Sequence, residues 1–181
     1  FAEGAFTSAF VPMLSHKLVT DGRGKALEFA AQSISVLTFF LAIFVIILEF
    51  AMPYVIPVLA PGFADDPGKI ELATSLSRIT FPFLLFISIV SFQSGILNSL
   101  GKFAAPAAAP VILNLMMIAS VFIFVPFGDT PAHGIAIGVT FAGFIEILWL
   151  IYFLRRENVY LRPRFDIFNL VGDSSIRTLF K

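Results

Sequence analysis

The chain has 181 residues, of which 58% are hydrophobic and 13% are charged, and its formal net charge is zero. Soluble domains contain about 45–50% apolar and about 25% charged residues, so the apolar surplus of this chain must face lipid. The zero net charge gives no basis for binding nucleic acid, and a sequence without cysteine has no disulfides and no cysteine-bound metal. We therefore expect an all-α, polytopic bundle of transmembrane helices.

Apolar runs recur along the chain, and about 20 such residues in a helix cross a hydrocarbon core of about 30 Å. Residues 1–18 have one apolar helical face but are too few to span, so we interpret them as the end of a truncated transmembrane helix. The composition predicts complete transmembrane helices at residues 26–60, 69–100, 104–126 and 133–154. We expect residues 155–181 to form a cytoplasmic linker and the start of a further helix.

Glycine, proline and polar residues mark the predicted connections. Residues 16–25 are expected to form a polar turn, and residues 101–103 a tight elbow between two long apolar runs. Pro53, Pro57 and Pro61 lack amide hydrogens, so they are expected to bend or end the 26–60 helix near the far interface.

Charge alternates between the predicted connections. The connections near residues 15–25, 101–103 and 155–181 carry the basic residues Lys17, Arg23, Lys25, Lys102, Arg155, Arg156, Arg162 and Arg164. The intervening connections carry Lys69 and Arg78 together with the acids Asp65, Asp66, Glu71 and Asp129. Because basic residues concentrate in cytoplasmic loops, the first set is predicted to be cytoplasmic.

Glu146 is the clearest functional candidate, because an ionisable residue inside a bilayer is costly and marks substrate or ion pathways. It precedes Arg155 by nine residues and so lies about 13 Å from the predicted cytoplasmic end of its helix. It could line a polar cavity or bind a proton or cation. The alternative is a protonated or bundle-facing acid paired with a neighbour. Glu49 lies near the outer end of its helix and is expected to reach the interface.

Other polar residues have two interpretations each. Gln93, Asn98 and Asn114 could line a hydrophilic cavity, but interhelical hydrogen bonding is their ordinary use in membranes. Glu3 is either a cavity residue or an interfacial one. Arg78 lies where an apolar run begins, so it either snorkels to the interface or contacts phosphate.

Signals of catalysis are weak. His16 and His133 are predicted on opposite sides of the membrane and therefore cannot share a metal or a catalytic triad. The sequence contains no glycine-rich phosphate loop, zinc-ligand spacing or GxSxG elbow. We expect a protein that is not an enzyme and that holds neither a metal nor a cofactor.

Five motifs occur in order over most of the chain, up to about residue 164: FAEGAFTSAFVPMLS at 1–15, LAPGFAD at 59–65, RITFPFLLFIS at 78–88, GILNSLGKFAAPAAAPVILNLMMIA at 95–119 and LRR at 154–156. Together they resemble the MurJ (MviN) lipid II flippases, in the wider superfamily of multidrug, oligosaccharidyl-lipid and polysaccharide exporters. The resemblance implies a longer protein of the bacterial cytoplasmic (inner) membrane, with two lobes around a hydrophilic cavity. This chain would be part of the N-terminal lobe. The partners implied are lipid II, membrane lipids and the remainder of the polypeptide.

The resemblance also implies movement of an undecaprenyl-pyrophosphate-linked precursor from the cytoplasmic to the periplasmic leaflet by alternating access. The substrate-binding arginines of the family would lie outside this chain. Glu3 matches a cavity-side polar position, whereas Asn98 and Asn114 match motif positions whose role is open. Glu146 stands where the family usually has an uncharged residue, so no role carries over to it.

Two other functions stay open at this point. A sodium- or proton-coupled exporter of drugs or polysaccharide would need an acid in the cavity of this lobe, and Glu146 is the one buried candidate. A membrane enzyme acting on polyprenyl phosphates would need acids or histidines at the cytoplasmic interface, where the sequence supplies mostly arginine and lysine.

Overall fold

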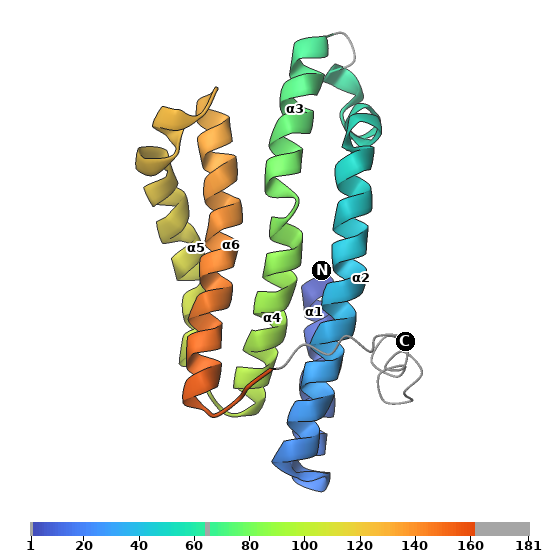
Figure 1. The fold of residues 1–181 in the computed structure, drawn as a ribbon, viewed down its shortest axis with the longest axis vertical. Helices are drawn as coiled ribbons and strands as arrows, with labels where there is room; N and C mark the ends of the chain where they lie inside the picture. Colours follow the sequence, from blue (N-terminus) through green and yellow to red (C-terminus); the bar gives the residue numbers. More distant parts are fainter. Residues whose placement is uncertain (1, 64–65, 162–181) are drawn as a thin grey trace. The chain divides into compact units, whose positions relative to one another are not determined.

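The computed structural model describes residues 2–63 and 66–161, with side chains from residue 8 onward. These ranges are helical and contain no strand, which confirms the all-α expectation (Figure 1). The elements are α1 (Ala2–Thr20), α2 (Gly22–Leu59), the 3₁₀ turn η1 (Pro61–Phe63), α3 (Pro67–Thr80), α4 (Phe83–Ser99), α5 (Ala104–Ile123), the 3₁₀ turn η2 (Val125–Phe127) and α6 (Pro131–Arg156). The further helix expected within residues 155–181 lies outside the described residues.

Four stretches of the described chain are long and apolar enough to cross a membrane: α2, α3 together with α4, α5, and α6. The chain divides into two compact units. Unit 1 comprises Phe1–Phe40, Ile87–Ala109 and Glu146–Lys181, and unit 2 comprises Leu41–Phe86 and Pro110–Ile145. All three connections predicted to be cytoplasmic belong to unit 1, and both of the others belong to unit 2.

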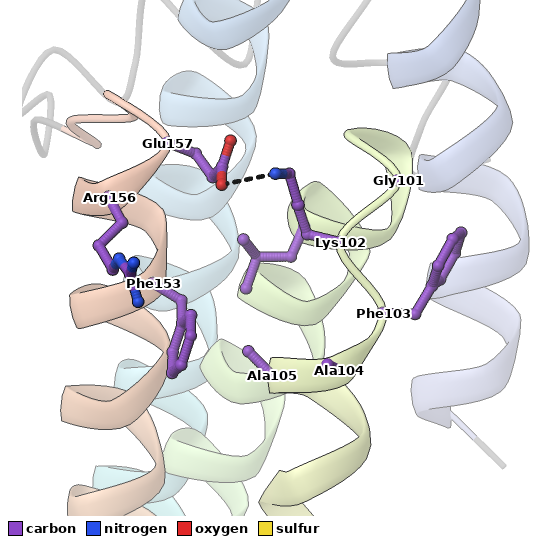
Figure 2. A pocket seen from close by; sticks show the side chains of 9 residues that line it. Gly101, Lys102, Phe103, Ala104, Ala105, Phe153, Arg156 and Glu157 are labelled. Atoms are coloured by element: carbon purple, nitrogen blue, oxygen red, sulfur yellow. Dashed lines mark ion pairs between the residues drawn. The ribbon is translucent and has the colours of Figure 1, made fainter.

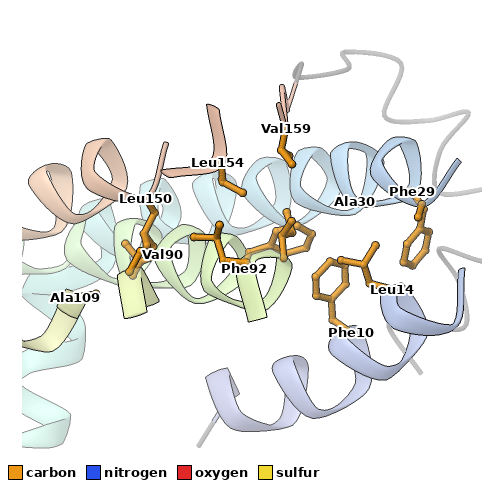
Figure 3. Packing of buried hydrophobic residues seen from close by; sticks show 14 of the residues in the cluster. Phe10, Leu14, Phe29, Ala30, Val90, Phe92, Ala109, Leu150, Leu154 and Val159 are labelled. Atoms are coloured by element: carbon orange, nitrogen blue, oxygen red, sulfur yellow. The ribbon is translucent and has the colours of Figure 1, made fainter. Parts of the chain in front are cut away.

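The core of unit 1 is built from apolar side chains spaced four residues apart, which lie on one face of a helix (Figure 3). On α1, the ring of the fully buried Phe10 is tilted against that of Phe92 of α4, with centroids 4.2 Å apart, and stacks on that of Phe29 of α2 at 6.1 Å. A Cβ at Gly95 of α4 would lie 3.3 Å from the Phe10 ring. This small residue therefore permits the close contact between α1 and α4. The remaining core positions include Leu14, Ile96, Leu97, Leu150 and Leu154.

Both α4 and α6 are followed, two residues after their last residue, by a residue with left-handed backbone. After α4, Gly101 has a φ of 74°, and the amide of Lys102 donates 2.8 Å back to the carbonyl of Leu97. After α6, Asn158 takes the equivalent position with a φ of 56°. This arrangement satisfies helix carbonyls that would otherwise lack donors, and glycine and asparagine are the residues that favour it.

Unit 2 contains close contacts of α6 with α5 and with η2 that the sequence pattern does not indicate. A Cβ at Gly138 would lie 2.1 Å from Cβ of Ser120, and a Cβ at Gly134 would lie 2.5 Å from Cα of Val125. The two glycines are four residues apart and share a face of α6. Small residues at this spacing let membrane helices approach closely.

The connection predicted over residues 16–25 is much shorter in the structure. Helix α1 continues to Thr20 and α2 begins at Gly22, so Asp21 alone separates them. The polar side chains here are compatible with a helix, and Lys17 pairs with Asp21 one turn later at 3.5 Å. The break falls at Gly22, whose φ of 81° suits glycine.

Proline interrupts one helical segment of unit 2 but not another. Helix α2 runs through Pro53 and Pro57 and ends at Leu59. The helix expected over residues 69–100 corresponds to the candidate span Pro67–Ser99, which a turn at residues 81–82 divides into α3 and α4. Pro82 cannot donate the amide hydrogen bond that would continue α3.

Candidate functional site

Glu146 and Gln93 are buried polar residues of unit 1. Glu146 lies on α6 with 1% of its surface exposed, and Gln93 lies on α4 with 3% exposed. The Oε1 atom of Gln93 has no hydrogen-bond partner among the described residues. An ionised carboxylate is costly in such surroundings unless it is paired. The burial of Glu146 thus places it inside the helix packing of unit 1.

The other polar candidates are Asn98, Asn114 and Glu3. Asn98 is half-buried near the end of α4, where its backbone carbonyl accepts a 3.0 Å bond from the amide of Gly101. Asn114 is exposed on α5 and belongs to unit 2. Glu3 lies in α1, and its side chain is outside the described part of the structure.

Arg78 and Glu49 meet in unit 2. The Nε atom of Arg78, in the last turn of α3, donates 3.1 Å to the backbone carbonyl of Glu49 on α2. The Oε1 atom of Glu49 is buried without a hydrogen-bond partner among the described residues. Glu49 therefore lies beside α3, and the expectation that its side chain reaches the interface stays a prediction.

An open cavity of about 570 Å³ lies in unit 1, between the α4–α5 connection and the end of α6 (Figure 2). We call it the elbow pocket. Its lining includes Lys102, Phe153, Arg156 and Glu157. The Nζ atom of Lys102 lies 2.9 Å from Oε1 of Glu157, and the guanidinium of Arg23 donates to the backbone carbonyl of Glu157.

The elbow pocket combines charge with apolar surface. The ion pair is only partly shielded, since the Lys102 and Glu157 side chains are 52% and 30% exposed. The guanidinium of Arg156 lies 5.9 Å from the centre of the Tyr152 ring. The pocket lining contains no Ser, Thr, Cys or His, so it offers charged groups for binding but no hydroxyl, thiol or imidazole nucleophile.

Sequence reasoning identified Lys102 as a cytoplasmic charge but missed Glu157 as its partner. The two residues are far apart in the chain and meet because α4 and α6 both end at this place. The available signal was a lone acid directly after the basic pair Arg155 and Arg156.

The two histidines fall in different units. In unit 2, His133 joins α6 to α3: its Nε2 lies 3.2 Å from Oγ of Ser75 and its Nδ1 lies 2.9 Å from Oγ1 of Thr130. His16 is exposed on α1 in unit 1. Among the described residues, no group of three or more His, Cys, Asp or Glu side chains could hold a metal ion.

The sequence is similar to a family of membrane transporters. The family model described as lipid II flippase MurJ matches residues 1–180. Proteins named probable lipid II flippase MurJ align with 91–99% of this chain. The one from Rhizobium tropici is 37% identical over 172 residues, covering 93% of this chain and 32% of the relative. The one from Vibrio cholerae is 36% identical over 186 positions, covering 99% of this chain and 35% of the relative. The one from Haemophilus influenzae is 34% identical over 171 residues, covering 91% of this chain and 34% of the relative.

The chain spans about a third of the length of these curated relatives. Its four candidate membrane spans make it a multi-pass membrane protein. The match extends over nearly every residue, including all the helices described above. The chain therefore belongs to the lipid II flippase MurJ family.

Proposed function

We propose that the protein to which this chain belongs is a lipid II flippase of the bacterial cytoplasmic (inner) membrane. It moves the undecaprenyl-pyrophosphate-linked peptidoglycan precursor from the cytoplasmic to the periplasmic leaflet. The observation that carries this proposal is the match of residues 1–180 to a family described by that activity. The four candidate spans support it, because a lipid flippase must enclose a path across the bilayer.

In this proposal the chain supplies most of the N-terminal lobe and the rest of the polypeptide supplies the first helix and the second lobe. Alternating access by two rocking lobes requires each to be well packed. The fully buried Phe10 cluster of unit 1 and the close Gly138–Ser120 contact of unit 2 are packing of this kind. The substrate pyrophosphate would be bound mainly by arginines outside this chain, with Glu3, Gln93, Asn98 and Asn114 as secondary cavity candidates.

The proposal is tested by depleting the full-length protein in cells and measuring lipid II in each leaflet of the cytoplasmic membrane. We expect lipid II to accumulate on the cytoplasmic side while its synthesis continues. Unchanged distribution after depletion would contradict the proposal, provided that no second flippase is expressed in the strain.

One observation favours a second candidate, an ion-coupled exporter of the same superfamily. Glu146 is an acid with only 1% of its surface exposed, as expected of a proton or sodium site. Glu146→Gln removes the charge and keeps the shape. If the full-length variant transports as well as the natural protein at every proton and sodium gradient tested, Glu146 is not a coupling site and its role is packing.

A further inference from the structure

Pro53 creates a defect in α2 that the helix does not resolve by itself. The carbonyl of Glu49 would normally accept the amide hydrogen of the residue four positions later, and that residue is Pro53, which has none. Helix α2 nevertheless continues through this point to Leu59. Proline is tolerated inside a spanning helix where a neighbouring helix, a side chain or an ordered water binds the freed carbonyl.

Arg78 is that donor. Its Nε atom approaches the carbonyl of Glu49 to 3.1 Å from the last turn of α3. Arg78 and Pro53 also both line an open cavity of about 620 Å³ in unit 2. The proline that removes one hydrogen bond and the arginine that supplies another therefore lie at the same place. Close by, the ring of Phe44 lies 6.4 Å from that of Phe81, between the same two segments of chain.

A side chain from another helix also donates to a backbone carbonyl at the turn between α3 and α4. The carbonyl of Ile79 lies four residues before Phe83, on the other side of the turn at residues 81–82. Thr140 of α6 donates to this carbonyl through Oγ1 at 2.6 Å. The carbonyl that Pro82 leaves without an amide donor is that of Arg78, so the Thr140 bond supplies a donor beside this turn and does not replace the bond that Pro82 removes.

We propose that Arg78 is a positioning residue that replaces the hydrogen bond removed by Pro53 and thereby fixes the outer part of α2 against α3. Arginine suits this role because Nε donates sideways into the helix while the two terminal nitrogens remain free to reach the interface. The Nε donor is thus committed to protein backbone rather than to a phosphate ligand. The role of Arg78 does not depend on which substrate the protein transports.

A double-mutant cycle on the full-length protein in lipid nanodiscs tests this proposal. Arg78→Met keeps the apolar stem and removes every donor, whereas Pro53→Ala restores a backbone amide that can bind the Glu49 carbonyl. We expect Arg78→Met to lower the Tm by about 1–3 °C in the natural background and by less than half as much in the Pro53→Ala background.

Pro57→Ala is the matched control. Pro57 lies one turn further along α2, and the carbonyl that it leaves without an amide belongs to residue 53 and not to Glu49. Arg78→Met should therefore lower the Tm fully in the Pro57→Ala background. Equal losses in all three backgrounds would overturn the proposal.

Folding itself provides the readout if Arg78→Met does not accumulate as a folded protein. In that case Pro53→Ala should restore folded protein and Pro57→Ala should not. Failure of Arg78→Met in all three backgrounds would show that Arg78 acts by some means other than the Glu49 carbonyl.

Discussion

Gly138 occupies a position on α6 where a larger residue has no room. The Cβ and Oγ atoms of Ser120 lie 2.1 and 2.5 Å from the place that a Cβ at Gly138 would take, and Ser120 is itself fully buried. Contacts below 3.0 Å between such atoms require the helix backbones to separate. The close packing of α6 against α5 in unit 2 therefore depends on position 138 having no side chain.

We predict that Gly138→Ala destabilises the full-length protein by about 2–3 kcal/mol, since overpacking a well-packed core costs about 1–3 kcal/mol and this overlap is large. Thermal unfolding in nanodiscs measures the effect. Gly24→Ala is the control, because a Cβ at this exposed position of α2 meets nothing within 4 Å. It should leave stability unchanged or raise it by up to about 1 kcal/mol. A Gly138→Ala protein as stable as the natural one would show that α5 and α6 are not in close contact.

The elbow between α4 and α5 is an element whose backbone geometry matters more than its charge. Gly101 has a φ of 74°, which costs an L-residue about 1–2 kcal/mol. The ion pair between Lys102 and Glu157 is half-exposed, and such pairs contribute only about 0–1 kcal/mol. The turn, rather than the ion pair, should therefore account for most of the stability of the elbow.

The comparison of Gly101→Ala with Lys102→Ala tests this ranking. We expect the loss of unfolding free energy to be about 1–2 kcal/mol for Gly101→Ala and below about 1 kcal/mol for Lys102→Ala. Raising the salt concentration should reduce the effect of Lys102→Ala and leave that of Gly101→Ala unchanged. The reverse order of the two losses would mean that the ion pair is more shielded than its exposure indicates.

The sequence predicted the elements better than the contacts between them. Helical runs and the alternation of basic connections are local properties, so residue order is enough to find them. The pairs Lys102–Glu157 and Arg78–Glu49 join residues distant in the chain, and single-sequence patterns do not indicate which distant residues meet. The turn at Pro82 is not indicated by the sequence pattern either, because the residues on both sides of it form one continuous apolar run.

The candidate site was predictable to a similar degree. The rule that marks ionisable residues inside a membrane identified Glu146, and the structure buries it. The same rule does not select Glu157, because this residue lies just beyond the end of α6. Its interaction with Lys102 is visible only in the structure. Arg78 was considered as a snorkelling residue or a phosphate ligand, whereas its Nε binds a backbone carbonyl. The sequence does not indicate this hydrogen bond, because it depends on the fold bringing Arg78 next to Pro53.

For the whole molecule, the topology of the spans is a separate prediction. Lys25 and Asp129 are both exposed and belong to connections predicted on the cytoplasmic and the opposite side, respectively. In a cysteine-free version of the full-length protein, a membrane-impermeant maleimide should label Asp129→Cys in intact spheroplasts. It should label Lys25→Cys only after the membrane is permeabilised. Labelling of Lys25→Cys in intact spheroplasts would invert the proposed orientation.

Reconstitution measures whether the full-length protein moves a lipid-linked precursor between leaflets, as we propose. The purified protein is placed in lipid vesicles that contain fluorescent lipid II, and the fraction of lipid II accessible to a membrane-impermeant quencher is followed with time. We expect the accessible fraction of lipid II to change faster than in vesicles without protein, and the lipid II to be chemically unaltered at the end. Protein-containing vesicles that exchange lipid II no faster than empty ones, under every ion gradient tried, would contradict the proposal.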